Sequence, residues 1–217
     1  MFTQAALRIF RKDSGGSSEE QRVIEGSNQR YADDWSRDGR FLIYHELAPG
    51  TLRDLWILPF TPQGKIPGGA KPSLYLRTKF NETNARFSPE PSPRWLAYQS
   101  DETGRFEVYI RGFPEPRDEV PISTAGGQYP EWGAGGRELF FVAPDNKLMA
   151  VDLTITADRV RAATPRALFT LPIIDGWSPY DTIDAQRFLV RALPQQASPL
   201  TVIVNWPALL KKGTAGQ

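Results

Sequence analysis

The amino-acid sequence predicts an all-β protein, a partial β-propeller of about four to five four-stranded blades. Similar strand-and-turn segments recur at intervals of 43 to 54 residues, a period typical of propeller blades. Short runs of β-branched and aromatic residues alternate with turns rich in Gly, Pro, Asn and Asp. Helical patterns are scarce: the best candidate, residues 206–212, contains Pro207, which limits it to one or two turns.

Four segments share one pattern. In each, a large apolar residue is followed by a polar turn, an arginine and a short apolar strand. The segments are residues 35–44, 87–98, 132–141 and 183–190. A leucine recurs at one place in their strands, at Leu42, Leu96, Leu139 and Leu189. The second segment has a longer turn without glycine, residues 89–93, and the fourth begins with Ile183 instead of an aromatic residue.

The order of these segments predicts the domain organisation. Residues 1–29 are expected to supply strands of an incomplete first blade and a polar Gly/Ser loop. Residues 30–212 are expected to form the blades, and residues 213–217 a disordered tail. After each repeat segment a second strand is expected, at residues 55–58, 107–110, 148–151 and 200–204.

Composition excludes several function classes. The 26 Lys and Arg against 25 Asp and Glu leave a net charge of +1, so we expect no binding of nucleic acid or of an anionic membrane. The chain has no cysteine and a single histidine, His45, so neither thiolate chemistry, a metal site nor a cofactor is expected. No apolar run approaches the length of about 18 residues that membrane insertion needs. The N-terminus lacks the features of a signal peptide, and the compartment stays open.

The string Trp-Ser-Arg-Asp-Gly-Arg-Phe-Leu-Ile-Tyr at residues 35–44 resembles the TolB-type, WD40-like (PD40) propeller repeat. Residues 122–132 and 201–212 are similar to the C-terminal propeller of acidobacterial serine/threonine protein kinases. The resemblance implies a propeller that binds or senses, as the C-terminal part of a larger protein, and it implies no kinase activity because the kinase motifs are absent. Such propellers generally have six or more blades, so self-association is expected to complete the ring.

Catalytic motifs are not found. Residues 176–180 lack the final glycine of a nucleophile elbow, and the glycine run 133–136 precedes a strand instead of a helix. His45 is interpreted as an edge or loop residue. Carboxylates that a propeller glycosidase or lyase could use stand mostly in turn-like sequence: Asp33, Asp34, Asp38, Asp101, Glu102, Asp118, Glu119 and Asp145.

The leading hypothesis is therefore a non-catalytic module that binds a protein or peptide, with the carboxylate enzyme as the alternative. Four arginines recur at one repeat position and could either surround a channel mouth or pair within their own turn or with the next blade: Arg40, Arg94, Arg137 and Arg187. Trp177 and Tyr180 are expected at a binding surface. The repeat aromatics are expected between blades: Trp35, Phe87, Trp132, Tyr44, Tyr98 and Phe141. Two facing carboxylates in a pocket would favour the enzyme, and a mouth of arginines and aromatics the binding module.

Overall fold

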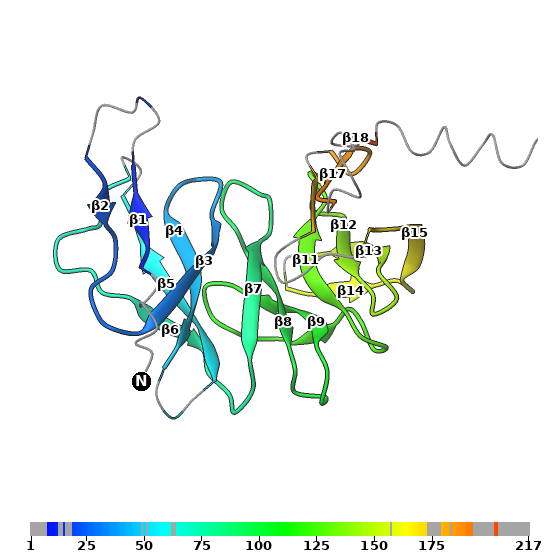
Figure 1. The fold of residues 1–217 in the computed structure, drawn as a ribbon, viewed down its shortest axis with the longest axis horizontal. Coiled ribbons are helices and arrows are strands. Elements are labelled where there is room, and N and C mark those ends of the chain that lie inside the picture. Colours follow the sequence, from blue (N-terminus) through cyan, green and yellow to red (C-terminus); the bar gives the residue numbers. More distant parts are fainter. Residues whose placement is uncertain are drawn as a thin grey trace, which may run out of the picture.

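The computed structural model describes residues 8–192, except 13–14, 16–18, 49, 51, 62–63, 157, 173–178 and 183, together with the backbone of 202–203. All regular structure in these residues is antiparallel β-sheet (Figure 1). None of them belongs to a helix that could cross a membrane. The all-β prediction is confirmed for this part of the chain.

Two four-stranded sheets form the first half of the array. Each is a meander in which strands that follow one another in sequence lie side by side. The strands of the first sheet are β3 (Gln29–Trp35), β4 (Phe41–Leu47), β5 (Arg53–Pro59) and β6 (Ser73–Leu76). Those of the second are β7 (Glu82–Phe87), β8 (Trp95–Ser100), β9 (Glu107–Gly112) and β10 (Val120–Pro121).

The remaining sheets repeat this plan with variations. In the five-stranded third sheet the long strand β13 pairs with β12, β14 and β15. Its strands are β11 (Gln128–Trp132), β12 (Glu138–Val142), β13 (Lys147–Ile155), β14 (Val160–Ala162) and β15 (Arg166–Thr170). The fourth sheet holds β16 (Tyr180–Thr182), β17 (Phe188–Val190) and β18 (Val202–Ile203). A hairpin of β1 (Phe10–Arg11) and β2 (Gln21–Arg22) precedes the first sheet, within residues 1–29, where strands of an incomplete blade were expected.

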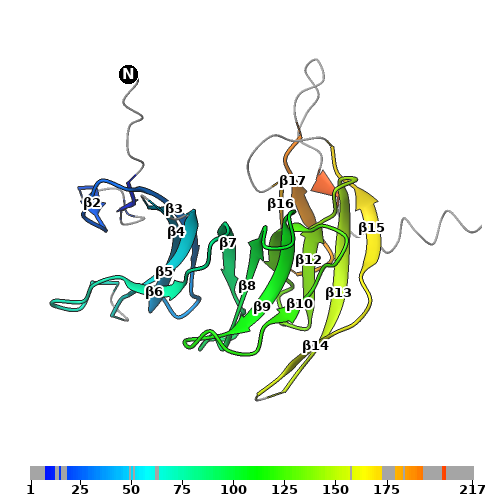
Figure 2. The same ribbon diagram turned by 90° about the horizontal axis from the view of Figure 1, so that it is seen from below.

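The sheets stack face to face, as the blades of a propeller do, and Figures 1 and 2 show them following one another in sequence order. Alternate residues of a strand point to opposite faces of its sheet, so a strand between two neighbours is apolar on both faces. In β12, Leu139 and Phe141 pack toward the second sheet, whereas Phe140 and Val142 pack toward the fourth. The β-propeller prediction is confirmed by this arrangement.

The repeat alignment needs one correction. Leu42, Leu96 and Leu139 are at most 4% exposed, but Leu189 is 51% exposed. Leu189 pairs with Asp181, as Leu42 pairs with Trp35, so the fourth repeat begins at residue 181 and not at 183. Seven residues separate Asp181 from Leu189, against six between Trp35 and Leu42, and this one-residue insertion misaligned the segment.

The repeat aromatics are buried between sheets as expected, with one exception. Phe87, Trp132, Tyr44, Tyr98 and Phe141 are at most 5% exposed. The prediction was wrong for Trp35, which is 40% exposed and packs only one side against Phe60, with ring centroids 4.7 Å apart. The sheet that precedes Trp35 is the two-stranded hairpin, which is too small to cover this side chain. The expected helix at 206–212 and the tail at 213–217 lie outside the described residues.

Candidate functional site

The innermost strands of three successive blades, β3, β7 and β11, each contain a break in regular strand pairing at an equivalent position. The pairing register shifts between Ala32 and Asp34 in β3, between Thr83 and Arg86 in β7, and between Gln128 and Glu131 in β11. Each shift ends one residue before the large apolar residue of the repeat. Bulges of this kind bend a strand and re-aim its side chains, and they are frequent beside active sites.

Two bulge residues have a left-handed backbone. Asn84 has a φ of 52° and Tyr129 a φ of 56°. Asparagine tolerates this conformation, whereas tyrosine rarely adopts it. The backbone of Tyr129 is held from both neighbouring blades: its N–H donates to Gln99 Oε1 at 2.8 Å, and its carbonyl accepts from the Tyr180 hydroxyl at 2.8 Å. Strained backbone that the surrounding structure holds in this way is typical of ligand-binding sites.

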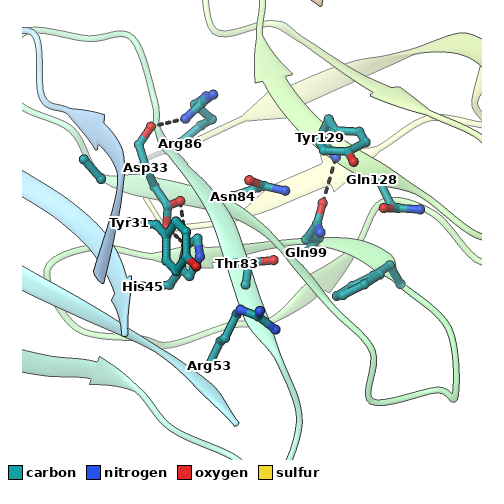
Figure 3. Close-up of a pocket in the computed structure, with 12 residues that line it drawn as sticks. Tyr31, Asp33, His45, Arg53, Thr83, Asn84, Arg86, Gln99, Gln128 and Tyr129 are labelled. Atoms are coloured by element: carbon teal, nitrogen blue, oxygen red, sulfur yellow. Dashed lines mark hydrogen bonds and ion pairs between the residues drawn. The ribbon is translucent and has the colours of Figure 1, made fainter. Parts of the chain in front are cut away.

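A cavity of about 460 Å³ lies where the bulged strands meet (Figure 3). Its lining mixes three kinds of side chain. The aromatic residues are Tyr31, Phe106 and Tyr129, the amides are Asn84, Gln99 and Gln128, and the charged residues are Asp33, Arg53 and Arg86, beside His45. Ala32 and Thr83 complete the wall. This volume lies in the usual range for small-molecule sites.

His45 belongs to this cavity, and its interpretation as an edge or loop residue was wrong. It lies in β4, between β3 and β5, and is 8% exposed. His45 Nδ1 lies 2.8 Å from Asp33 Oδ1, and the imidazole stacks on Tyr31 with centroids 4.8 Å apart and planes 12° apart. The bulge at Asp33 makes this contact possible, because it moves that carboxylate out of the regular alternation of β3.

Arg86 connects three blades at the base of the cavity. Its Nε donates to Glu131 Oε2 of β11 at 2.8 Å, and its Nη1 donates to the carbonyl of Asp33 in β3. Burial opposes the charge on Arg86, yet Glu131 raises the pKa of the guanidinium above its ordinary value. Burial raises the pKa of Glu131 and of Asp34, and Arg86 offsets part of that rise. The guanidinium of Arg86 is therefore already paired with groups of β3 and β11.

Arg53 is placed differently. Its Nη1 donates to Asn81 Oδ1 at 3.2 Å, and among the described residues no carboxylate lies within ion-pair distance of it. Asn81 is in turn oriented by Asp101, which accepts from the Asn81 backbone N–H at 2.8 Å and from its Nδ2 at 2.7 Å. The cavity therefore holds one cation whose observed partner is neutral.

The four repeat arginines do not line this cavity. They lie in the turns after β3, β7, β11 and β16. In the first blade, β4 begins at Phe41, directly after this turn, and the cavity residue His45 is four residues farther on. Four residues of extended strand span about 13 Å, so the turn lies away from the cavity. Three of them bind the carboxylate of their own turn: Arg40 with Asp38 at 2.7 Å, Arg94 with Glu90 at 3.5 Å, and Arg187 with Asp184 at 2.6 Å. Arg40 also donates to Ser92 of the next blade at 2.7 Å.

Arg137 is exposed, and its turn has Gly135 where Asp38 stands in the first repeat. Within the described residues it has no carboxylate partner. A second cavity of about 490 Å³ brings Arg137 and Arg94 together with Glu90. The structure thus joins two of the four arginines at one site, at the opposite end of the blades from the inner-strand cavity.

The expected surface position of Tyr180 was wrong. Tyr180 is 4% exposed, because its ring packs into the core between the third and fourth sheets. Burial raises the pKa of its hydroxyl well above the ordinary value. Trp177 lies outside the described residues. No group of three or more Asp, Glu and His side chains in the described part of the chain could hold a metal ion.

Apart from Asp33 and His45, the residues that line the inner-strand cavity were not among the candidates from the sequence. The candidate arginines Arg40, Arg94 and Arg137 lie in the turns after Trp35, Phe87 and Trp132, whereas the bulged segments of the cavity wall lie before these aromatic residues. Ala32, Asn84 and Tyr129 occupy the same place, three residues before those aromatics. An asparagine inside a strand-like run was the available signal for the irregular backbone.

No protein-family model matches this chain, and no curated protein matches it. Solved structures do. A protein from Bacteroides uniformis, assigned provisionally as a 6-phosphogluconolactonase, is 11% identical with a TM-score of 0.52, over 91% of this chain and 64% of that one. TolB from Acinetobacter baumannii is 13% identical with a TM-score of 0.43, over 89% of this chain and 56% of that one.

The periplasmic gluconolactonase PpgL of Pseudomonas aeruginosa is 15% identical with a TM-score of 0.37, over 90% of this chain and 76% of that one. At these identities the likeness concerns the fold alone. The chain spans about two thirds or less of the first two structures that it matches. The kinase resemblance has no counterpart among these matches and stays a prediction. The fold that this chain shares with the Bacteroides protein is thus the extent of the established similarity.

Proposed function

We propose that the chain is a non-catalytic propeller module that binds a protein or peptide segment in the inner-strand cavity. The observation that carries the proposal is the bulge that recurs at one step of β3, β7 and β11. Three strands of separate blades depart from regular pairing where their side chains meet. Function on such folds usually resides in irregular backbone held by a rigid scaffold.

The lining of the cavity supports binding over glycoside hydrolysis or a lyase reaction. A glycosidase needs two carboxyl groups that face each other at about 5–10 Å. Asp33 is the single acidic residue among those that line this cavity, and it is held by His45. Arginines and aromatic rings, which are typical of protein-recognition sites, make up much of the remaining wall.

We further propose that the module works as part of a larger TolB-like or kinase-associated protein and that it self-associates. The repeat motif at residues 35–44 supports the first statement. The exposed apolar side chains of Trp35 in the first blade and Leu189 in the fourth, 40% and 51% exposed, support the second. The arginine-lined end around Arg94 and Arg137 stays a second candidate surface for a partner.

A cavity-blocking substitution tests the binding proposal. Peptides selected from a displayed random library on the wild-type chain are expected to bind Ala32→Trp at least about tenfold more weakly, because the indole would fill the cavity. Gln128→Trp is a second blocking variant, and Ala134→Trp, in the exposed turn after β11, is the matched control. Thermal unfolding establishes that each variant folds. Equal affinity of the folded blocking variants and the wild type, or selection of no peptide, would overturn the proposal.

Hydrolysis of a sugar lactone is a second candidate, which one observation favours. His45 lies in the cavity with Nδ1 against Asp33, the arrangement of an oriented general base. The Bacteroides protein of similar fold is assigned provisionally to lactone hydrolysis. The candidate predicts acid release from D-glucono-1,5-lactone that His45→Gln lowers by about 100-fold. Release at the rate of buffer alone would eliminate it.

A further inference from the structure

We propose that the inner-strand cavity selects peptide segments that carry an acidic side chain, with Arg53 receiving the carboxylate. This inference rests on the proposed binding function and adds the chemical class of the ligand. Asp33 is in hydrogen-bond contact with His45, and Arg86 is paired with Glu131 and donates to the Asp33 carbonyl, so these charged side chains already have partners within the protein.

Arg53 has hydrogen-bonding capacity to spare. A guanidinium carries five N–H donors in a planar fork, and the contact found for Arg53 is the one from Nη1 to Asn81 Oδ1. Because Asp101 accepts both hydrogen bonds that Asn81 donates, the Asn81 side chain is fixed with its oxygen toward Arg53. The guanidinium is therefore positioned while most of its donors stay available for a second acceptor. A planar carboxylate is an acceptor that such a fork can bind through two parallel hydrogen bonds.

The neutral groups of the cavity also favour an acceptor-rich ligand. Gln99 uses Oε1 to accept from the Tyr129 N–H, so its amide NH₂ is the part left to donate. In the view of Figure 3, Thr83 lies between Gln99 and Arg53, and Asn84 lies beyond Thr83 on the side away from Arg53. These side chains can satisfy the carbonyl groups of a peptide backbone, while Arg53 neutralises one negative charge. A single uncompensated cation matches one carboxylate better than a phosphate dianion.

The test compares acidic and neutral forms of the same peptide. Displayed random peptides selected on the wild-type chain are expected to be enriched in Asp and Glu. A synthetic copy of one enriched peptide is expected to bind about tenfold more tightly than its Glu→Gln form. Arg53→Gln is expected to abolish that preference, so that the acidic peptide and its Glu→Gln form bind with equal affinity. Arg137→Gln, which removes an exposed cation at the other end of the blades, is expected to preserve it.

The outcomes separate this inference from the proposed function. Peptides that depend on an open cavity but show no acidic preference, or a preference that survives in Arg53→Gln, would overturn the inference and leave the binding function standing. Peptides that ignore the Ala32→Trp block would overturn both. Inorganic phosphate is the second probe: saturable, Arg53-dependent phosphate binding without an acidic-peptide preference would assign the cation to a phosphate ligand instead. An unchanged Tm of Arg53→Gln confirms that the substitution acts on binding.

Discussion

At Tyr129 the backbone has a φ of 56°, a conformation that costs a residue with a Cβ about 1–2 kcal/mol. The hydrogen bonds to Gln99 and from Tyr180 hold it there, and each comes from a different blade. The site thus depends on single residues whose conformation is imposed by neighbours far away in the sequence. Such strain is retained at binding sites because it sets the direction of a side chain before the ligand arrives.

Glu82 is a second residue whose state is set by its surroundings. It is fully buried at the start of β7, where the Thr78 hydroxyl donates to Oε1 at 2.5 Å, and Oε2 has no hydrogen-bond partner among the described residues. Burial raises the pKa of Glu82 from 4.5 to about 7, Thr78 acts against this rise, and the nearby Asp54 and Asp101 add to it. The folded protein therefore binds a proton that the unfolded chain has lost.

This raised pKa predicts a pH-dependent stability. Between about pH 4.5 and pH 7 the folded state holds more protons than the unfolded state, so stability falls as the pH rises through this window. Glu82→Gln stays neutral and is expected to gain on the order of 1–2 kcal/mol relative to the wild type between about pH 5 and about pH 8. Urea unfolding at both pH values measures it, with the exposed Glu20→Gln as control. A difference between variant and wild type that does not change with pH would contradict the assignment.

At the level of the strands, the inner edge of the blades is held together by Arg86. Asp34 accepts from the Phe87 N–H at 2.8 Å, the Trp132 Nε1 donates to the Arg86 carbonyl at 3.1 Å, and the Arg86 guanidinium contacts β3 and β11. These contacts fix the three bulged strands relative to one another. The cavity keeps its shape because its walls belong to one hydrogen-bonded unit.

Removal of this arginine has a predictable cost. Arg86→Met leaves two partly buried carboxylates, Asp34 and Glu131, without their cation, and is expected to lower the free energy of unfolding by about 3 kcal/mol. Adding Glu131→Gln to the variant is expected to restore part of that loss, because one uncompensated charge disappears. Urea unfolding measures both. Arg187→Met removes an exposed arginine that pairs with Asp184; it is the control and is expected to leave stability unchanged. Equal stability of Arg86→Met and the wild type would show that the cluster does not hold the blades.

At the scale of the whole molecule, the sheets cohere because each inner blade buries both faces. Trp95 and Ala97 of β8 pack toward the third sheet, and Leu96 and Tyr98 pack toward the first. This two-sided burial is also why the fold could be predicted: strands that are apolar at every position, recurring between turns, belong in stacked sheets. The exposed Trp35 and Leu189 mark the blades where one face lacks a full neighbour.

The candidate site could be predicted only in part, for physical reasons. The repeat arginines can be recognised in the sequence because each lies in a short turn between two strands. For three of them, the carboxylate that pairs with the arginine lies in the same turn.

The inner-strand cavity depends on register shifts, and register is decided by pairing between strands, not by either strand alone. His45 and Arg53 lie on strands of one blade, and Asn84 and Tyr129 on strands of two others, so no motif joins them. The surface position predicted for Tyr180 was wrong because its burial comes from contacts with β11, a strand that is distant in the sequence.

The central claim is that three bulged inner strands of stacked blades form one recognition site. A crystal structure of the chain with a selected acidic peptide tests it most directly. The account predicts the peptide between β3, β7 and β11, with a carboxylate on Arg53 and a left-handed backbone at Asn84 and Tyr129. A peptide bound at the opposite end, against Arg94 and Arg137, or inner strands that pair regularly without bulges, would contradict it.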